Sequence, residues 1–184
     1  AGGNAGSNEG TLFDKTMKYA VIFDIDGTLA DSRHRIHYLN PPNGVKKNWT
    51  KFFTESSEDE VFPLVRKCVE IVYSTGIEPL MVTARPDSER ERTVAWLTRH
   101  SVPFTGLYMR GSTDRRVDHL VKQDLLAKIQ LDGYVPLAAL DDKTNVLDMW
   151  LSNGLRAYKC TDGVLEPYDR PIDPTPGDFG LGGD

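Results

Sequence analysis

Two aspartates, Asp24 and Asp26, stand two positions apart directly after a short apolar run, residues 20–23. Such a run is typical of a buried parallel strand, and open α/β sheets bind ligands beyond the carboxyl ends of their strands. Two carboxylates this close repel each other unless a cation neutralises them, and Mg²⁺ does so with oxygen ligands while leaving room for a phosphate. One carboxylate can then act as nucleophile and the other as acid and base. The alternative interpretation is a strand that ends in a polar Asp-Gly turn.

Further polar residues of the types that a phosphate and metal site uses follow downstream. A hydroxyl ends one apolar strand, an ammonium lies near the start of a helix, and an acidic pair ends another strand; these residues are Thr83, Lys122, Asp141 and Asp142. They are separated by the length of a strand plus a helix, so the carboxyl ends of parallel strands would bring them to one edge of a sheet. An arginine close behind the hydroxyl, Arg85, could add a charge-assisted contact to a phosphate.

Strands and helices are predicted to alternate between these residues. Apolar runs predict strands over 20–23, 78–83, 104–109, 135–140 and 155–159, and helical spacing of apolar residues predicts helices over 61–74, 87–100, 117–130 and 145–152. Alternation of this kind is typical of an α/β fold with a doubly wound, three-layer, Rossmann-like parallel sheet.

The segment from about 32 to 60 is too long for a simple loop and carries aromatic residues at helical spacing. We expect it to form a small helical lid inserted after the first strand and lying over the strand tip. Its basic residues would face phosphate if they point inward, or form a solvated helix face if they point outward; they are Arg33, His34, Arg35 and His37.

Length and composition indicate one ordinary globular domain. The chain has 184 residues, of which 39% are hydrophobic and 27% charged, and its net charge of −5 argues against a broad basic surface wrapped by nucleic acid. No apolar run is long enough to span a bilayer, and no signal-peptide pattern opens the chain. Two cysteines far apart argue against a disulfide framework, which favours a reducing cytoplasm.

Composition also divides the chain. Residues 1–16 are rich in Gly, Asn and Ser and are expected to be a flexible leader or the remnant of a tag, residues 17–165 to form the domain with its lid, and residues 166–184 to form a Pro/Gly-rich tail.

The run Asp24-Ile25-Asp26-Gly27-Thr28 resembles motif I, DxDGT, of the haloacid dehalogenase (HAD) superfamily of phosphotransferases. The resemblance implies that Asp24 is the nucleophile that forms a phosphoaspartate and that Asp26 is the acid and base. It also implies that the hydroxyl of motif II holds a phosphate oxygen and that the ammonium of motif III neutralises the nucleophile and the phosphate; these residues are Thr83 and Lys122. The implied Mg²⁺ ligands are Asp24, Asp26, Asp141 and Asp142.

Longer runs, covering most of residues 19–179, are similar to the phosphatase domain of bacteriophage-type polynucleotide kinase-phosphatases; they are TARPDSERERTVAWL, LYMRGSTDRRVDHLVKQDLL, LAALDDKTNVLDMWLSNGLRAYKC and Gly177-Asp178-Phe179. The similarity implies removal of 3′-phosphates from nucleic acid ends, with Mg²⁺ and a phosphoaspartate. It adds Arg35, Arg85 and Asp118 to the substrate site, with Arg33 as the alternative to Arg35. Asp118, one turn before Lys122, could orient that ammonium. No phosphate-loop motif is present, so a separate kinase or kinase domain would act beside this chain.

Three other functions remain to be weighed against this hypothesis. A small-molecule HAD phosphatase acting on nucleotides or sugar phosphates would share every catalytic residue. A non-enzymatic, receiver-like phospho-acceptor also has a doubly wound sheet with clustered acids, but here the tip of the third strand, around Met109, offers no aspartate. A catalytically dead binding module is disfavoured because no motif acid is missing.

Overall fold

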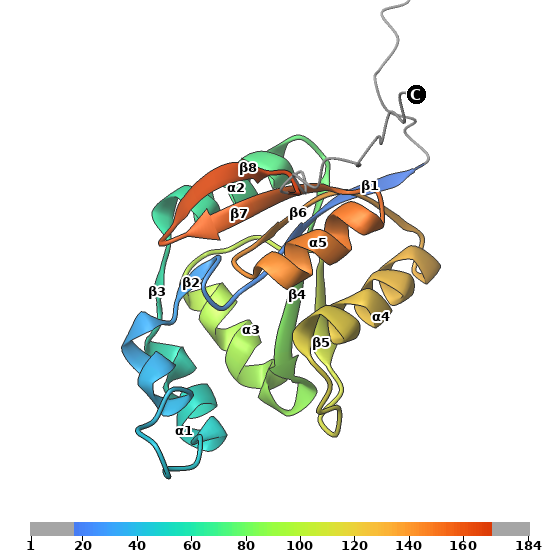
Figure 1. The fold of residues 1–184 in the computed structure, drawn as a ribbon. Helices are drawn as coiled ribbons and strands as arrows, with labels where there is room; N and C mark the ends of the chain where they lie inside the picture. Colours follow the sequence, from blue (N-terminus) through green and yellow to red (C-terminus); the bar gives the residue numbers. More distant parts are fainter. Residues whose placement is uncertain (1–16, 171–184) are drawn as a thin grey trace, which may run out of the picture.

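The computed structural model describes residues 17–170. In chain order the elements are β1 (Lys18–Phe23), β2 (Ala30–Asp31), η1 (Arg33–Tyr38), α1 (Trp49–Thr54), η2 (Glu55–Glu58), β3 (Glu60–Val61), α2 (Pro63–Ser74), β4 (Glu78–Pro86), η3 (Asp87–Glu89), α3 (Arg90–Arg99), β5 (Gly106–Arg110), α4 (Asp118–Leu131), β6 (Tyr134–Asp141), α5 (Thr144–Ser152), β7 (Arg156–Thr161) and β8 (Val164–Tyr168), where η denotes a 3₁₀ helix. Figure 1 shows this arrangement.

The six-stranded sheet has the order β5-β4-β1-β6-β7-β8. Every pairing within it is parallel except that of β7 with β8. Strand β1 therefore lies between β4 and β6, and the chain moves outward from β1 in both directions, which makes β1 and β6 a topological switch point. The prediction of a doubly wound parallel sheet is confirmed. Because β1, β4 and β6 run in the same direction, the residues that follow them meet at one edge.

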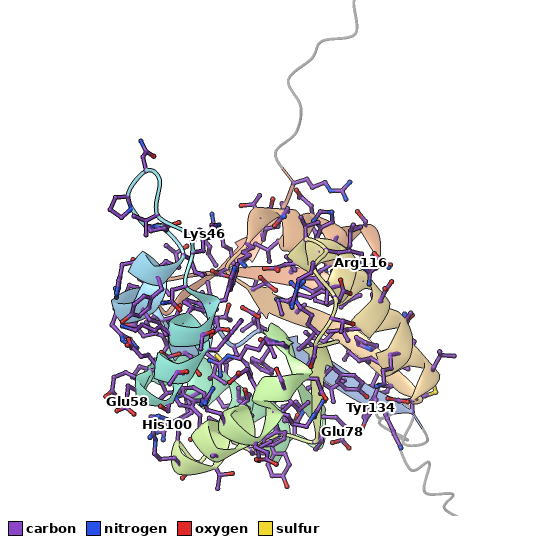
Figure 2. The ribbon with its side chains drawn as sticks, turned by 90° about the horizontal axis from the view of Figure 1, so that it is seen from below. Lys46, Glu58, Glu78, His100, Arg116 and Tyr134 are labelled. Atoms are coloured by element: carbon purple, nitrogen blue, oxygen red, sulfur yellow. The ribbon has the colours of Figure 1, made fainter. Side chains whose placement is uncertain are left out.

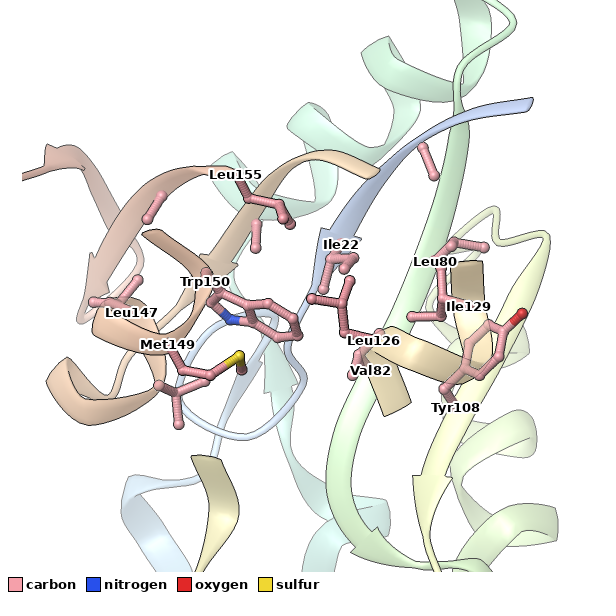
Figure 3. Packing of buried hydrophobic residues seen from close by; sticks show 14 residues of the cluster. Ile22, Leu80, Val82, Tyr108, Leu126, Ile129, Leu147, Met149, Trp150 and Leu155 are labelled. Carbon is pink, nitrogen blue, oxygen red and sulfur yellow. The ribbon is translucent and has the colours of Figure 1, made fainter. Parts of the chain in front are cut away.

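Two hydrophobic cores cover the two faces of the sheet. Alternate residues of the strands face opposite sides, so Ile22 belongs to the core under α4 and α5, whereas Phe23 belongs to the core under α2 and α3. Trp150 is fully buried in the first core and Trp96 is 1% exposed in the second. Figure 3 shows the first core, with Trp150 beside Ile22 and Leu126. The result is the predicted three-layer architecture of helices, sheet and helices.

Between β1 and α2 the chain forms a group of short helices. We call residues 32–59 the helical insertion; it contains η1, α1 and η2, and the two-stranded sheet of β2 and β3 closes its base. The backbone N–H of Phe62 donates to Leu29 O at 2.9 Å, which fixes the two ends of the insertion next to each other. The insertion is helical, as the sequence predicts.

Strand β8 is absent from the sequence-based prediction. The turn residues Asp162 and Gly163 both have positive φ, 49° and 81°, and return the chain antiparallel to β7. The strand runs to Tyr168, past the boundary at 165 that composition indicates. Pro167 hides the strand pattern in the sequence, and it is tolerated in β8 because this strand lies at the edge of the sheet.

Two sequence-based expectations fall on residues that the structure does not describe. These are the leader or tag remnant at 1–16 and the run Gly177-Asp178-Phe179 in the tail. Among residues 17–170, no helix is long and apolar enough to cross a membrane.

Candidate active site

Three carboxylates meet where β1 and β6 end. Phe23 pairs with Leu140 in the sheet, and the backbone N–H of Asp24 donates to Leu140 O at 3.0 Å, so Asp24 lies beside the acidic pair that follows. Asp24, Asp141 and Asp142 each offer a carboxylate oxygen, and these oxygens lie within 4.8 Å of one another. This is the acidic cluster that the two strand tips predict.

The ammonium of Lys122 reaches the acidic cluster from α4. It donates to Asp24 Oδ1 at 2.8 Å and to Asp141 Oδ2 at 2.6 Å, and its side chain is 2% exposed. Burial alone would lower the pKa of Lys122, but Asp141 and Asp24 raise it above its ordinary value, so this residue stays a cation. The structure thus brings the predicted helical lysine to the predicted nucleophile.

The acidic cluster carries more negative charge than one lysine can neutralise. Burial raises the pKa of Asp24 well above its ordinary range, with Lys122 opposing and the two neighbouring acids adding to the rise, and burial with Asp141 raises the pKa of Asp142 to about 6. The buried Asp142 Oδ1 also has no hydrogen-bond partner. Three carboxylates against one ammonium leave a formal charge of −2, so this donor set fits a divalent, oxygen-preferring cation.

Gly27 allows the acidic cluster to form. It has a φ of +83°, which other residues rarely adopt, and a Cβ at this position would lie 2.5 Å from Asp142 Oδ2. The glycine of the DxDGT run therefore serves two purposes: it turns the chain sharply after β1 and leaves space for the side chain of Asp142.

Asp26 lies in a second charged group, away from the acidic cluster. Arg85 binds its carboxylate through Nε at 2.9 Å and Nη2 at 2.6 Å, and Arg35 Nη2 donates to the same carboxylate. Burial alone would raise the pKa of Asp26, but these two guanidinium groups hold it well below its ordinary range. The structure does not bring this carboxylate into the acidic cluster, so three of the four predicted metal ligands, Asp24, Asp141 and Asp142, have their carboxylates together.

The two arginines share another acid, Asp59, that sequence reasoning missed. It is 1% exposed and accepts from Arg35 Nε at 2.7 Å, from Arg35 Nη2 at 2.5 Å and from Arg85 Nη2 at 3.4 Å. Trp96 Nε1 donates to its backbone oxygen at 2.8 Å. We call Asp26, Arg35, Asp59 and Arg85 the arginine–aspartate quartet. Asp59 stands in a run of acidic residues at the end of the insertion, where nothing in the sequence sets it apart.

Two threonines place hydroxyl groups at the strand edge. Thr28 Oγ1 donates to Asp24 Oδ2 at 3.2 Å. Thr83 Oγ1 accepts the backbone N–H of Arg85 at 3.2 Å, so its own hydrogen remains available to an acceptor. Thr83 lies inside β4, which continues to Pro86 and not to 83 as the sequence predicts, but two residues past Met81, the β4 residue that pairs with the last residue of β1.

Asp118 holds two other cations instead of Lys122. Its carboxylate accepts from Arg110 Nη2 at 2.5 Å and from Lys143 Nζ, and Arg110 also donates to Ala84 O at 2.8 Å. The expected pairing with Lys122 one turn later is replaced, because that ammonium turns toward the acidic cluster. Asp118 thereby connects the ends of β4, β5 and β6 around the site.

The basic residues of the insertion divide into inward and outward groups. Arg35 is fully buried in the quartet, whereas Arg33 is exposed and pairs with Asp31 at 2.5 Å. The structure therefore places Arg35 at the site and the alternative, Arg33, outside it. His34 Nε2 lies 2.8 Å from Asp59 Oδ1, while His37 is exposed and contacts the ring of Tyr38.

The fold and these charged groups define a HAD-type phosphatase. A family model described as the polynucleotide kinase PNKP phosphatase domain matches residues 18–164, and the chain belongs to this family. The resemblance seen in the sequence is thus confirmed, and with it a phosphatase of the hydrolase class.

Solved structures share the fold. A chain of a Pnkp1/Rnl/Hen1 complex is 24% identical, with a TM-score of 0.68 over 80% of this chain and 47% of that one, so this chain spans about half the length of that relative. A putative phosphatase from Clostridium difficile is 16% identical, with a TM-score of 0.56 over 78% of this chain and 85% of its own length. A class C acid phosphatase from Bacillus anthracis is also 16% identical, with a TM-score of 0.55 over 70% and 54%.

Replacing Asp59 with Asn should destabilise the protein by about 3–5 kcal/mol, because it leaves two buried guanidinium groups with one carboxylate. Urea unfolding with EDTA present measures this free energy. The matched control is Asp31→Asn, which removes the acid from an exposed Asp–Arg pair and should cost less than about 1 kcal/mol. Equal losses in the two variants would contradict the role given to Asp59.

Replacing Gly27 with Ala should reduce phosphatase activity on p-nitrophenyl phosphate at least about tenfold, because 1.4 kcal/mol of lost transition-state stabilisation has that effect and the new methyl group must displace Asp142. Gly76→Ala is the control: its φ is +79°, but nothing lies within 4 Å of the added carbon. Both variants carry the same backbone strain, so a comparable loss of activity in both would show that strain alone is responsible.

Proposed function

We propose that this protein is a Mg²⁺-dependent phosphomonoesterase that removes 3′-phosphates from nucleic acid ends. The observation that carries the chemistry is the contact of Asp24 with Lys122 inside a cluster of three carboxylates. The observation that favours a nucleic acid end is membership of the polynucleotide kinase PNKP phosphatase family over residues 18–164. A structural relative from the Pnkp1/Rnl/Hen1 RNA repair complex agrees with this substrate class.

In the proposed reaction Asp24 is the nucleophile. Its carboxylate oxygen forms a bond to phosphorus while the bond from phosphorus to the 3′-oxygen breaks, and Asp26 gives a proton to the departing oxygen. Water then attacks the phosphoaspartate, Asp26 takes a proton from that water, and the bond between phosphorus and Asp24 breaks to release phosphate. The proton that Asp26 gives to the leaving oxygen in the first step is thus replaced by one from water in the second step.

Other residues hold the phosphate during both steps. The free hydrogen of Thr83 Oγ1 would donate to one phosphate oxygen, and Lys122 would offset the charge that develops as Asp24 approaches. Because Lys122 is buried and already placed by two acids, no large rearrangement is needed for it to act. Most of the catalysis would then come from positioning and electrostatics.

Mg²⁺ fits the donor set of Asp24, Asp141 and Asp142, as the unpartnered oxygen of Asp142 and the excess negative charge indicate. When bound there, it would supply positive charge against the phosphoryl oxygens and keep the nucleophile ionised. The carboxylate of Asp26 remains outside this set, bound to arginines, and keeps its proposed role in proton transfer.

The quartet places a condition on the acid step. Because Arg85 and Arg35 keep Asp26 ionised in the free protein, it can act as a base at once but must take up a proton before it acts as an acid. An arriving phosphate dianion competes for the same guanidinium groups. We infer that the arginines shift toward the substrate phosphate and thereby raise the pKa of Asp26.

A kinase in another chain or domain would act on the 5′ end at the same break in the nucleic acid strand.

Adding Mg²⁺ to EDTA-treated protein should raise Tm by about 5–10 °C at a concentration 100 times the Kd, because a ligand that binds only the folded state stabilises it. Asp142→Asn should lose most of this rise, since it removes a charge from the acidic cluster. Asp124→Asn, at an exposed acid on α4, should keep it. The site is misassigned if Asp142→Asn responds to Mg²⁺ as the wild type does.

Phosphate release should be fastest from an oligonucleotide with a 3′-phosphate. The comparison includes the same oligonucleotide phosphorylated at its 5′ end and a 3′-mononucleotide, each with Mg²⁺ and with EDTA, and Asp24→Asn protein as the blank. Because Asn cannot form the acyl phosphate, the blank should release none. Equal or better turnover of the mononucleotide would leave the phosphatase chemistry standing and point to a small-molecule substrate instead.

A further inference from the structure

The helical insertion is basic over most of its length, in contrast to the rest of the protein, and its three acids, Glu55, Glu58 and Asp59, stand at its end. Residues 32–54 contain five Lys and Arg residues and no Asp or Glu, in a chain whose net charge is −5. Arg35 is buried in the quartet, but the three lysines are exposed; they are Lys46, Lys47 and Lys51. None of these three forms an ion pair with an acidic side chain within residues 17–170. They therefore give a local positive surface whose charge is not offset by ion pairs within the described residues.

An exposed tryptophan lies among these lysines. Trp49 is 51% exposed, whereas the other two tryptophans, Trp96 and Trp150, are buried. Its ring stacks on Phe53, with centroids 5.9 Å apart and planes at 24°, and meets Phe52 edge-on at 6.1 Å. The exposed indole is thus held by two other rings, as a fixed platform rather than a loose side chain.

Cations lie over the aromatic rings of the same surface. Lys47 Nζ is 5.9 Å from the centroid of Trp49, and Lys51 Nζ is 5.7 Å from that of Tyr38. Tyr38 is itself anchored by its hydroxyl, which donates to Glu55 Oε1 at 2.7 Å. Aromatic rings interleaved with lysines are what proteins use to bind single strands, because bases stack on the rings and phosphates meet the ammonium groups.

This surface is connected directly to the active site. Phe52 packs against Trp49, and the guanidinium of Arg35 lies 4.1 Å from the ring centroid of Phe52 and donates to Phe52 O at 3.1 Å. The same guanidinium binds Asp26. In Figure 2 the loop that carries Lys46 projects from the body of the protein. Through Phe52 and Arg35, α1 is thus linked by direct side-chain contacts to Asp26.

We propose that Trp49, together with Lys46, Lys47 and Lys51, binds the nucleotides that precede the terminal 3′-phosphate of a single strand. A base stacks on Trp49, and the lysines contact the backbone phosphates on either side. This inference rests on the proposed function and extends it, because it assigns the preference for a polymer over a mononucleotide to the helical insertion. Charge complementarity decides the occupant: a polyanion with flat rings matches this surface, whereas the rest of the protein is acidic.

Binding is tested with Asp24→Asn protein in Mg²⁺, so that a fluorescent oligonucleotide with a 3′-phosphate stays intact, and Kd is measured by anisotropy at several salt concentrations. A triple Lys→Gln variant at 46, 47 and 51 should lower the slope of log Kd against log salt by about 2, at about 0.7 per lost contact. The matched control changes three other exposed lysines, Lys18, Lys67 and Lys128, by the same charge and should keep the slope.

Trp49→Ala, in the same background, should weaken binding about 5- to 100-fold, the range that loss of one base stack gives, and Trp49→Phe should recover part of this affinity. A spectroscopic readout is independent of any folding defect in the variants. Trp49 is the exposed tryptophan, so acrylamide quenching of the Asp24→Asn protein reports on it, and the oligonucleotide should reduce that quenching.

The two proposals fail in different ways. If wild-type protein releases no phosphate from the 3′-phosphorylated oligonucleotide, the proposed function is wrong, and so is the proposal that Trp49 and the three lysines bind a nucleic acid strand. If it does release phosphate, but the lysine triple variant matches its control in Kd and salt slope, or the oligonucleotide leaves quenching of Trp49 unchanged, the strand lies elsewhere and only this inference is overturned.

Discussion

Repulsion among carboxylates at one sheet edge is the constraint around which this protein is built. The strand order places the residues after β1 and β6 side by side, so Asp24, Asp141 and Asp142 cannot avoid one another. The ammonium of Lys122 contacts Asp24 and Asp141, and its helix, α4, packs on the sheet through a hydrophobic core. The remaining charge makes the site receptive to a divalent cation and to chemistry that moves negative charge.

The packing of the sheet explains how so much charge can be kept in place. Each face of the sheet is covered by helices with a large buried tryptophan in their core, Trp150 on one side and Trp96 on the other. Both tryptophans also reach the site: Trp96 donates to the backbone of Asp59, and Trp150 Nε1 lies 3.5 Å from Asp141 Oδ2. The cores therefore stabilise the fold and orient the acids at the same time.

The sequence was sufficient for the fold and for the acidic cluster, because both follow from local patterns. An apolar run that ends in DxDGT predicts a strand, a turn and a phosphate-transfer site within a few residues. Asp141 and Asp142 give the same kind of signal at the end of a second strand. Asp59 gives no such signal, since its role depends on two arginines that lie 24 and 26 positions away. The pairing of Asp118 with Arg110 and Lys143 was missed for the same reason: helical spacing suggested Lys122, but the tertiary structure decided between nearby cations.

The quartet is divided evenly between two parts of the chain. Arg35 and Asp59 belong to the helical insertion, whereas Asp26 lies on the turn after β1 and Arg85 lies in β4. Each half contains one cation and one anion in mutual contact, so each half is electrically neutral by itself. If the insertion moved away from the sheet, each side would keep one intact ion pair and no unpaired charge would be left in the interior. The electrostatic cost of this separation is therefore far lower than that of breaking a single buried ion pair. The junction is strong in contacts yet balanced in charge, which is the electrostatic condition for an insertion to move as a unit.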